Sequence, residues 1–460
     1  MPALTDYVAN FASHLDETLI PLDVEALGKK AILDALGVSL SGSVSEPTRV
    51  VVSYLQDLNC QGSSSVLGTT LKLPPRFAAL ANGTSIHADD YDDTLQAETG
   101  RFQGIHPTAP VLAALLAAGE PRGISGRQLL TAYQVGVEVA CRLFDATHVN
   151  HILHGFHATG TCGMLGASAA VSRLYGLSTQ ETSVALGIAA SQAGGLQENF
   201  GTMVKPFHAG RSAECGIVSN DLQRKGFTAS AIILEAKRGF FQALGGGFEE
   251  QRLLNKLGNP WSFVDRGIWL KPYPTGSLGH PAMTAMEKLV RTHDIQHKDV
   301  KKINLKTSKN IHHTLLHHRP QTELEAKFSL EFCLAALLLD RQCGLNQFTD
   351  EYVQKEDIQN IISLINYTGF TAEEELQNHH TIVTSYVEIV LHNNQSFSLR
   401  ADFGKGNKAD PMTENEIADK FRECADFAKW NKVKTEKAIS LIQNLEKLAD
   451  IRELTACLTF

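Results

Sequence analysis

Acidic side chains are concentrated in one short segment, His87-Ala-Asp-Asp-Tyr-Asp-Asp-Thr94, which carries four carboxylates within five residues. Carboxylates this close repel one another unless a cation or a proton offsets their charge. Asp89, Asp90 and Asp93 have the spacing of a DDxxD motif, which chelates magnesium and a diphosphate in helical isoprenoid synthases. The sequence contains no second acidic motif of that kind. The alternative interpretation is an acidic loop exposed to solvent.

Four histidines follow one another at a spacing of three residues: His148, His151, His154 and His157. The spacing suggests a metal site, but on a helix only neighbouring members of such a run share a face. No acidic or cysteine ligand lies within the run, so we predict no bound metal and interpret most of these histidines as core or surface residues. His157 differs because it opens a segment rich in small residues, where a shielded imidazole is available for proton transfer.

Two lysines lie in segments suited to binding an anion. Lys205 stands among apolar residues, so its ammonium group must either reach solvent or meet an anion. Lys271 opens the loop KPYPTGSLGHP, whose prolines and glycines impose an irregular and rigid backbone. The alternative for each lysine is simple exposure on the surface. Neither lysine is accompanied by a phosphate-binding glycine loop or a nucleophile elbow.

The segments that would position these side chains are mostly helical. Apolar residues recur at helical spacing from Val24 to Leu40, and Pro110 stands at the start of another apolar helix. Residues 159–175 and 181–195 are dense in Gly, Ala and Ser, which allow helix backbones to approach closely. We therefore predict two central buried helices in these two ranges.

The pattern changes after residue 262. There we predict strands over 263–270 and 300–307. We also predict a helix over 280–292 and a hairpin over 386–400. Amphipathic helices then continue to the C-terminus. The predicted fold class is therefore mostly α. A large all-helical domain, 1–262, is completed by 406–460, and a smaller α+β domain spans 263–405.

Composition and charge restrict the classes of partner. The formal net charge of −8 argues against a general nucleic-acid or membrane surface, although a locally positive pocket would still accept an anionic substrate. No segment is long and apolar enough to span a membrane, and the N-terminus does not resemble a secretion signal. The eight cysteines are scattered without a CxxC pair, which favours free thiols and a cytoplasmic protein.

Taken together, six segments resemble the MmgE/PrpD family in their order and spacing. That family includes 2-methylcitrate dehydratase, cis-aconitate decarboxylase and iminodisuccinate epimerase. The resemblance runs over nearly the whole chain and is strongest from 75 to 285. The segments are ILDALGVSLSG (32–42), HADDYDDT (87–94), HPTAPVLAAL (106–115), GFHATGTCGMLGA (155–167), GTMVKPFHAGRSAECG (201–216) and KPYPTGSLGHPAM (271–283).

The resemblance implies a large helical domain completed by the C-terminus, an α+β lid domain, a homodimer and a pocket between the domains. It also implies a lyase without a bound cofactor, which dehydrates or decarboxylates a small di- or tricarboxylate through a carbanion or enolate. The lysines would bind substrate carboxylates and stabilise that charge, and the histidines would transfer protons. Carried over to this chain, the pocket residues are Asp90, Thr94, His106, His157, Lys205 and Lys271.

Three other functions stay open, one of which is a non-catalytic binding protein. An epimerase or isomerase of a small dicarboxylate would use the same proton abstraction without a leaving group, and outside the family a magnesium-dependent isoprenoid synthase would use the acidic segment. Two positions also depart from the decarboxylases. These enzymes have a histidine where this chain has Gly276, and a tyrosine just before an Arg-Pro pair where this chain has His317 and His318. Both departures weaken the expectation of aconitate decarboxylation.

Overall fold

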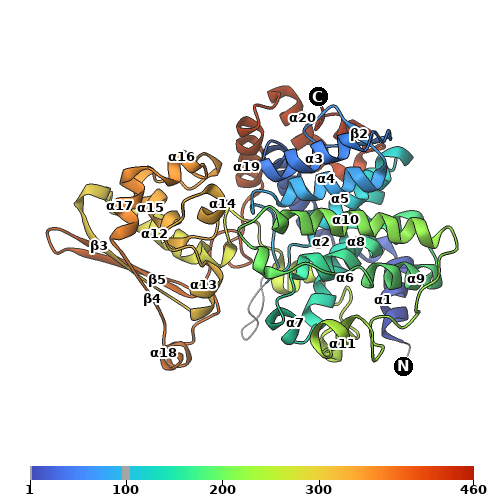
Figure 1. The fold of residues 1–460 in the computed structure, drawn as a ribbon, viewed down its shortest axis with the longest axis horizontal. Coiled ribbons are helices and arrows are strands. Elements are labelled where there is room, and N and C mark those ends of the chain that lie inside the picture. The colour runs from blue at the N-terminus through green and yellow to red at the C-terminus, as the bar shows by residue number, and fades with distance from the viewer. Residues whose placement is uncertain (1–2, 96–103) are drawn as a thin grey trace. The chain divides into compact units, whose positions relative to one another are not determined.

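The computed structural model describes residues 3–95 and 104–460, which fall into two compact units (Figure 1). Unit 1 contains the described residues up to Ile268 together with Thr413–Phe460, and unit 2 contains Trp269–Met412. The mostly helical fold class expected from the sequence is confirmed. The domain boundaries expected at 262 and 406 stay a prediction.

Helices make up most of unit 1. A short antiparallel ribbon pairs Ser64–Ser65 (β1) with Lys72–Leu73 (β2). The helices are α1 (Leu4–His14), α2 (Leu22–Ser43), α3 (Glu46–Asp57), α4 (Pro75–His87), α5 (Thr108–Gly119), α6 (Gly126–Ala146), α7 (Asn150–Leu153), α8 (Ala158–Tyr175), α9 (Thr179–Ala190), α10 (Val204–Gln223), α11 (Phe240–Gly245), α19 (Glu414–Phe427), α20 (Lys432–Gln443) and α21 (Arg452–Thr455).

The centre of unit 1 is formed by α4, α5, α8 and α10, and α6 packs on α8. Small residues let these helix backbones touch. A Cβ atom added to Gly166 in α8 would lie 2.6 Å from the carbonyl oxygen of Gly136 in α6. A Cβ on Gly83 in α4 would lie 2.9 Å from Cα of Gly210 in α10. The buried helix predicted over 159–175 is therefore confirmed as α8, whereas the helix predicted over 181–195 ends at Ala190.

The C-terminal segment returns to unit 1, where α19 packs against α2 (Figure 1). A Cβ on Gly37 would lie 2.8 Å from Cα of Phe421, so the two helices are in close contact. The buried ammonium group of Lys420 in α19 lies 2.6 Å from Asp34 Oδ1 in α2 and donates a hydrogen bond to the carbonyl oxygen of Tyr91 (2.7 Å). The C-terminal helices thus complete the helical unit and hold its acidic segment.

Unit 2 contains a four-stranded sheet in the order β4-β3-β5-β6, in which β3 and β4 are parallel and the other neighbours are antiparallel. Helices α12, α15 and α17 pack together over this sheet (Figure 1). The bounds are α12 (His280–Thr292), β3 (Val300–Thr307), α13 (Lys309–Thr314), α14 (Glu323–Ala326), α15 (Leu330–Asp340), α16 (Asp350–Val353), α17 (Glu356–Ser363), β4 (Ile365–Gly369), α18 (Ala372–Gln377), β5 (Ser385–Leu391) and β6 (Ser396–Ala401).

Three of the four elements predicted after residue 262 are confirmed: α12, β3 and the β5–β6 hairpin, whose turn contains Asn394 in the left-handed conformation (φ 67°). The strand predicted over 263–270 is wrong, because this segment contains one turn of π-helix, Phe263–Gly267 (η5). The cause is a buried carboxylate on α6. Glu138 accepts the backbone N–H groups of Gly258 (3.0 Å) and Ser262 (2.7 Å), which curls the chain that follows.

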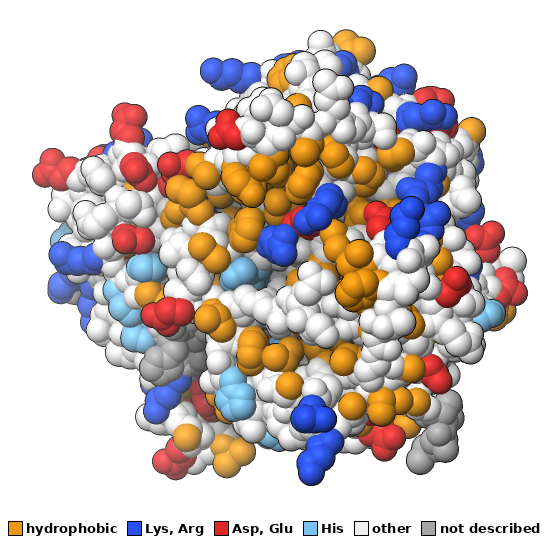
Figure 2. Space-filling view, turned by 45° about the vertical axis from the view of Figure 1, so that its right-hand side comes forward, with side chains coloured by type: hydrophobic (Ala, Val, Ile, Leu, Met, Phe, Trp, Pro, Cys, Tyr) orange, Lys and Arg blue, Asp and Glu red, His pale blue; other side chains and the backbone are white. Residues whose placement is uncertain are grey.

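Surface features of the chain bear on its partners. No helix in the described ranges is long and apolar enough to cross a membrane. All eight cysteines are free thiols, and all but Cys60 are buried. Apolar side chains form several groups on the face drawn in Figure 2. Large apolar side chains that are more than half exposed in unit 1 include Leu19, Leu22, Val50, Tyr54, Leu153, Leu196 and Phe227.

Candidate active site

The acidic segment that follows α4 is buried, so its interpretation as a solvent-exposed loop is wrong. Its carboxylates turn towards different helices. Asp89 accepts a hydrogen bond from Ser41 Oγ in α2 (2.7 Å), and Asp93 accepts one from Thr108 Oγ1 in α5 (2.5 Å). Neither belongs to a group of described side chains whose ligand atoms are close enough to share an ion. This divergence argues against the DDxxD interpretation, which requires Asp89, Asp90 and Asp93 to converge.

Asp90 forms a buried ion pair with Lys205, which lies in the first turn of α10. Lys205 Nζ is 2.7 Å from Asp90 Oδ1, and both residues are less than 5% exposed. The alternative of a surface-exposed Lys205 is therefore wrong. Asp90 has φ 50°, a left-handed conformation that is uncommon outside glycine and that concentrates at functional sites. The backbone strain and the buried charges coincide at one residue.

Asp93 differs from its neighbours in charge. Burial raises the pKa of the Asp93 carboxyl well above its usual value, although the hydrogen bond from Thr108 opposes this effect. The group is therefore favoured in its uncharged form. The backbone carbonyl of Asp93 lies 2.8 Å from Nδ1 of His106. Thr94 is also buried, and its hydroxyl donates to the carbonyl oxygen of Ile105 (3.3 Å), next to His106 in the chain.

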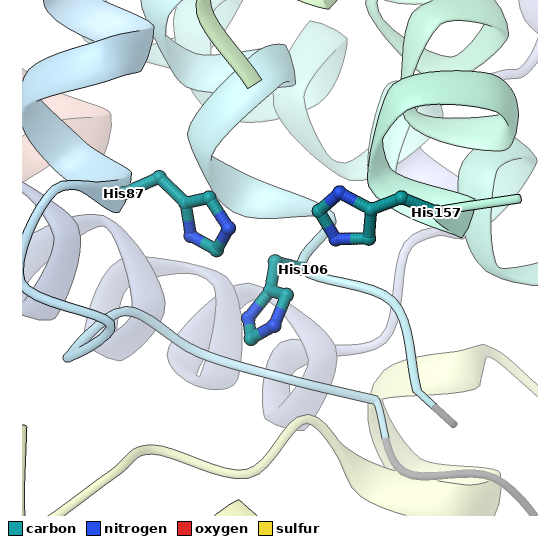
Figure 3. A group of neighbouring side chains, drawn as sticks. All are labelled: His87, His106 and His157. Carbon is teal, nitrogen blue, oxygen red and sulfur yellow. The ribbon is translucent and has the colours of Figure 1, made fainter. Parts of the chain in front are cut away.

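Three histidines from separate segments face one another in unit 1 (Figure 3). His87 is the last residue of α4, His106 lies just before α5, and His157 is the N-cap of α8. The ring centroid of His87 is 4.5 Å from that of His106 and 6.0 Å from that of His157. His106 and His157 were expected from the sequence, whereas His87 was not. The available signal was its place as the first residue of the acidic segment.

Neighbouring acceptors determine which nitrogen carries a proton in the rings of His87 and His106. Nδ1 of His87 lies 2.8 and 2.9 Å from the two carboxylate oxygens of Asp92, so it donates, and Nε2 retains a lone pair. This Nε2 atom is buried and has no hydrogen-bond partner among the described residues. The contact of His106 Nδ1 with a carbonyl likewise leaves its lone pair on Nε2. His157 Nδ1 pairs with Nδ1 of His208 (3.1 Å), and one of the two donates.

Burial and positive charge favour the neutral forms of His87, His157 and His208. Burial is the largest cause that lowers the pKa of His157 well below its usual value, followed by the ammonium group of Lys205 and the other rings. The pKa of His87 is also lowered, by burial and by Lys205, against the opposing charge of Asp92. The pKa of His208 falls to about 4, chiefly through burial. Near neutral pH these three rings are therefore favoured as proton acceptors.

The rest of the histidine run has ordinary contacts. His151 is buried and pairs through Nε2 with Thr161 Oγ1 (2.9 Å), whereas His154 is exposed. Helix α7 contains only Asn150–Leu153, so the four histidines do not share one helix. Among the described residues, only His157 of this run belongs to a group that could hold a metal ion, together with His87 and His106.

Lys271 lies in unit 2 and is buried, with 1% of its surface exposed, so the alternative of an exposed Lys271 is wrong too. The loop that follows it is held in place, as its composition predicted. Thr275 Oγ1 and the N–H of Gly276 both donate to the carbonyl oxygen of Lys327 (2.6 and 3.1 Å). A Cβ on Gly276 would lie 2.6 Å from Leu315 Cδ2, so a larger residue there requires Leu315 to move.

Two family models match consecutive parts of the chain. One is described as the MmgE/PrpD N-terminal domain and matches residues 6–252. The other is described as the MmgE/PrpD C-terminal domain and matches residues 273–447. The interval between the two matches contains residue 268, at which the described structure changes from unit 1 to unit 2.

Curated relatives cover most of the chain. It is 29% identical over 442 residues to cis-aconitate decarboxylase of Homo sapiens, an alignment that covers 94% of this chain and 89% of that protein. Identity to cis-aconitate decarboxylase of Mus musculus is 28%, with coverage of 94% and 88%. The cis-aconitate decarboxylase of Aspergillus terreus is 27% identical, with coverage of 98% and 95%.

The lowered pKa of His208 predicts how the stability of the fold depends on pH. Its pKa is about 4 in the folded chain and roughly 6.5 in an unfolded chain. Between these values the unfolded state binds more protons, so the free energy of unfolding falls as the pH is lowered. We expect His208→Gln to lose less stability than the parent protein between pH 7.5 and 5.5, measured by urea unfolding. His154→Gln, at an exposed position, should match the parent; a steeper pH dependence in His208→Gln would contradict the assignment.

Proposed function

The chain belongs to the MmgE/PrpD family and is one of its lyases, and we propose that it acts on a small di- or tricarboxylate without a bound cofactor. The observation that carries the proposal is the buried pair of Lys205 and Asp90 in the same unit as three neighbouring imidazoles, of which His87 and His157 are favoured in their neutral form. The named relatives act on cis-aconitate, a small carboxylate of the proposed class. The absence of a cofactor rests on the family resemblance alone.

Lys205 is the proposed partner of a substrate carboxylate. Its ammonium group already holds one carboxylate, that of Asp90, at 2.7 Å in a buried position. A substrate carboxylate would share or replace this partner, and the pair would be strong because the surroundings have a low dielectric constant. We propose the same role for Lys271, the second buried lysine selected from the sequence. These cations would also stabilise negative charge that develops next to the bound carboxylate.

The histidines supply the proposed proton transfers. In a dehydration, an imidazole lone pair takes a proton from carbon, the electron pair forms an enolate, and hydroxide leaves as water after protonation. In a decarboxylation, the C–C bond breaks, carbon dioxide leaves, and the resulting carbanion takes a proton from a protonated or N–H imidazole. His87, His106 and His157 are the candidates for these steps. His87 is well suited to act as the base because Asp92 holds its Nδ1–H and its Nε2 lone pair is unpaired among the described residues.

Two observations bear on which acid of this class is the substrate. The decarboxylase relatives make cis-aconitate the first acid to test. Gly276 stands where the decarboxylases have a histidine, and a larger side chain there would require Leu315 to shift, so this departure weakens the expectation of cis-aconitate. An epimerase that uses the same proton abstraction is the second candidate, and it is favoured by the same departure.

Proton NMR in deuterated water distinguishes these reactions. The panel contains citrate, methylcitrate, cis-aconitate, tartrate and aspartate-like acids. We expect a new product from at least one of them, with deuterium incorporated at the carbon that receives the proton. Exchange without a new product would identify an epimerase and reject the lyase. Turnover of prenyl diphosphates, with no turnover of any acid, would reject the proposed substrate class altogether.

Lysine variants test whether Lys205 and Lys271 bind substrate. The alternative explanation for Lys205 is that it only neutralises Asp90. Lys205→Met and Lys271→Met should each lower kcat/KM by about 10²-fold or more, because loss of a buried charge pair costs several kcal/mol. The double variant Asp90→Asn/Lys205→Met removes both charges. It should stay impaired if Lys205 binds substrate, and it should recover activity if Lys205 serves only Asp90. Lys225→Met, at an exposed position, is the matched control. Circular dichroism checks that each variant is folded.

We also propose a homodimer, as the family resemblance implies. The exposed apolar side chains of unit 1 offer surface of the kind that stable homodimers bury. Light scattering coupled to gel filtration should give about twice the chain mass of 50.2 kDa. A mass equal to one chain would reject the dimer.

A further inference from the structure

The three facing histidines have a second property that proton transfer does not use. Three ring nitrogen atoms, one each from His87, His106 and His157, lie within 4.8 Å of one another. The three side chains lie next to one another and come from three different segments (Figure 3). The buried Nε2 atom of His87 has no hydrogen-bond partner among the described residues, so a lone pair in this region is unused. A metal ion, which accepts lone pairs from several side chains, would use this lone pair.

We propose that His87, His106 and His157 form a binding site for one divalent ion of the zinc type, and that the bound ion blocks the site rather than serves it. Neutral imidazole nitrogens suit Zn²⁺ and Co²⁺, whereas Mg²⁺ and Ca²⁺ prefer oxygen ligands. Three histidines with one further position for water or an anion are a known arrangement for zinc.

The contacts around the three rings match those of histidines that bind metals. Such histidines donate their other ring nitrogen to a carboxylate or a carbonyl, which fixes the orientation of the ring. His87 donates Nδ1–H to Asp92, and Nδ1 of His106 contacts the carbonyl oxygen of Asp93. For His157, donation of Nδ1–H to His208 leaves its Nε2 lone pair for the ion. A metal ion would thus select one of the two possible tautomers of the His157–His208 pair.

The net charge of the surroundings permits a cation. Lys205 carries a positive charge that would repel the ion, but it is paired with Asp90 at 2.7 Å. Asp92 adds a second negative charge in contact with His87, and the lowered pKa values of His87 and His157 favour their neutral forms. The sum of these charged groups is −1, so a divalent ion is attracted. Asp90 also offers an oxygen within 4.8 Å of ligand atoms of His87 and His106, which supplies a candidate fourth ligand.

The ligand atoms need a small inward movement. With zinc–nitrogen distances of about 2.0–2.1 Å, two nitrogen atoms of a tetrahedral site lie about 3.4 Å apart. The nitrogen atoms would therefore approach one another by up to about 1.4 Å from their present limit of 4.8 Å. His106 can contribute much of this movement, because it precedes α5 rather than lying within a helix, and its side chain is 12% exposed.

Metal binding and proton transfer would exclude each other. A lone pair that is bound to a metal ion cannot accept a proton from a substrate. This consequence rests on the proposed function, whereas binding of the ion does not. The ion would therefore act as a reversible inhibitor, and the enzyme would be active in its metal-free form.

Cobalt tests the site directly because tetrahedral Co²⁺ absorbs visible light. The full chain, treated with EDTA and dialysed, should bind one equivalent of Co²⁺ with a saturable tetrahedral spectrum, which added Zn²⁺ should abolish. His87→Gln, His106→Gln and His157→Gln should each lose this spectrum, and Asp92→Asn should weaken binding by about 10- to 100-fold. His154→Gln is the matched control, because it makes the same substitution outside the three rings. It should bind Co²⁺ as the parent protein does. His106→Gln, at the least buried of the three positions, guards against loss of folding.

No tetrahedral Co²⁺ spectrum in the parent protein would overturn the proposal, and so would an unchanged spectrum in folded His106→Gln and His87→Gln. Activity provides an independent second measurement. On the acid identified by NMR, Zn²⁺ should inhibit the parent protein, and EDTA should restore full activity. Activation by Zn²⁺ would overturn the blocking role and the proposed metal-free reaction together, whereas the cobalt spectrum would still report whether the site exists. Lack of activity on every acid would reject the proposed function and leave the spectroscopic test unaffected.

Discussion

The segment Asp89–Asp93 lies in the interior of unit 1, where an uncompensated charge would cost several kcal/mol. Each carboxylate has its own compensation. A hydroxyl of α2 contacts Asp89, the ammonium group of α10 pairs with Asp90, an imidazole pairs with Asp92, and Asp93 is favoured in its uncharged form. Satisfying all four draws the end of α4 and the starts of α5 and α10 to one place. The reactive side chains lie together because these charges had to be paired.

Close packing of helices makes this convergence possible. The glycines at the contacts of α4 with α10 and of α6 with α8 would clash if they carried a Cβ atom. With larger residues the helix axes would separate, and contacts such as 2.7 Å between Lys205 and Asp90 would be lost. The small residues therefore act on the chemistry indirectly, by setting the distance between the elements that carry it.

The same burial that constrains the carboxylates makes the histidines versatile. Desolvation and the nearby ammonium group disfavour imidazolium, so His87 and His157 present lone pairs near neutral pH. A lone pair in a shielded place can accept a proton from a substrate or bind a soft cation. The ion pair of Lys205 with Asp90 prevents the cluster from being strongly positive and preserves both possibilities.

Local pattern in the sequence was sufficient for the helices α2, α8 and α12, the strand β3 and the β5–β6 hairpin, because periodicity and turn residues act over a few neighbours. It also singled out the acidic segment and both lysines as unusual. Only the tertiary structure decided that these groups are buried and how they pair, since Lys205 and Asp90 are 115 positions apart. The π-helical turn at 263–267 depends on the carboxylate of Glu138, and the importance of His87 depends on Asp92 and on two rings from other segments. Pairing of buried charges depends on residues that are far apart in the sequence. Short-range patterns therefore do not identify the partner of each charge.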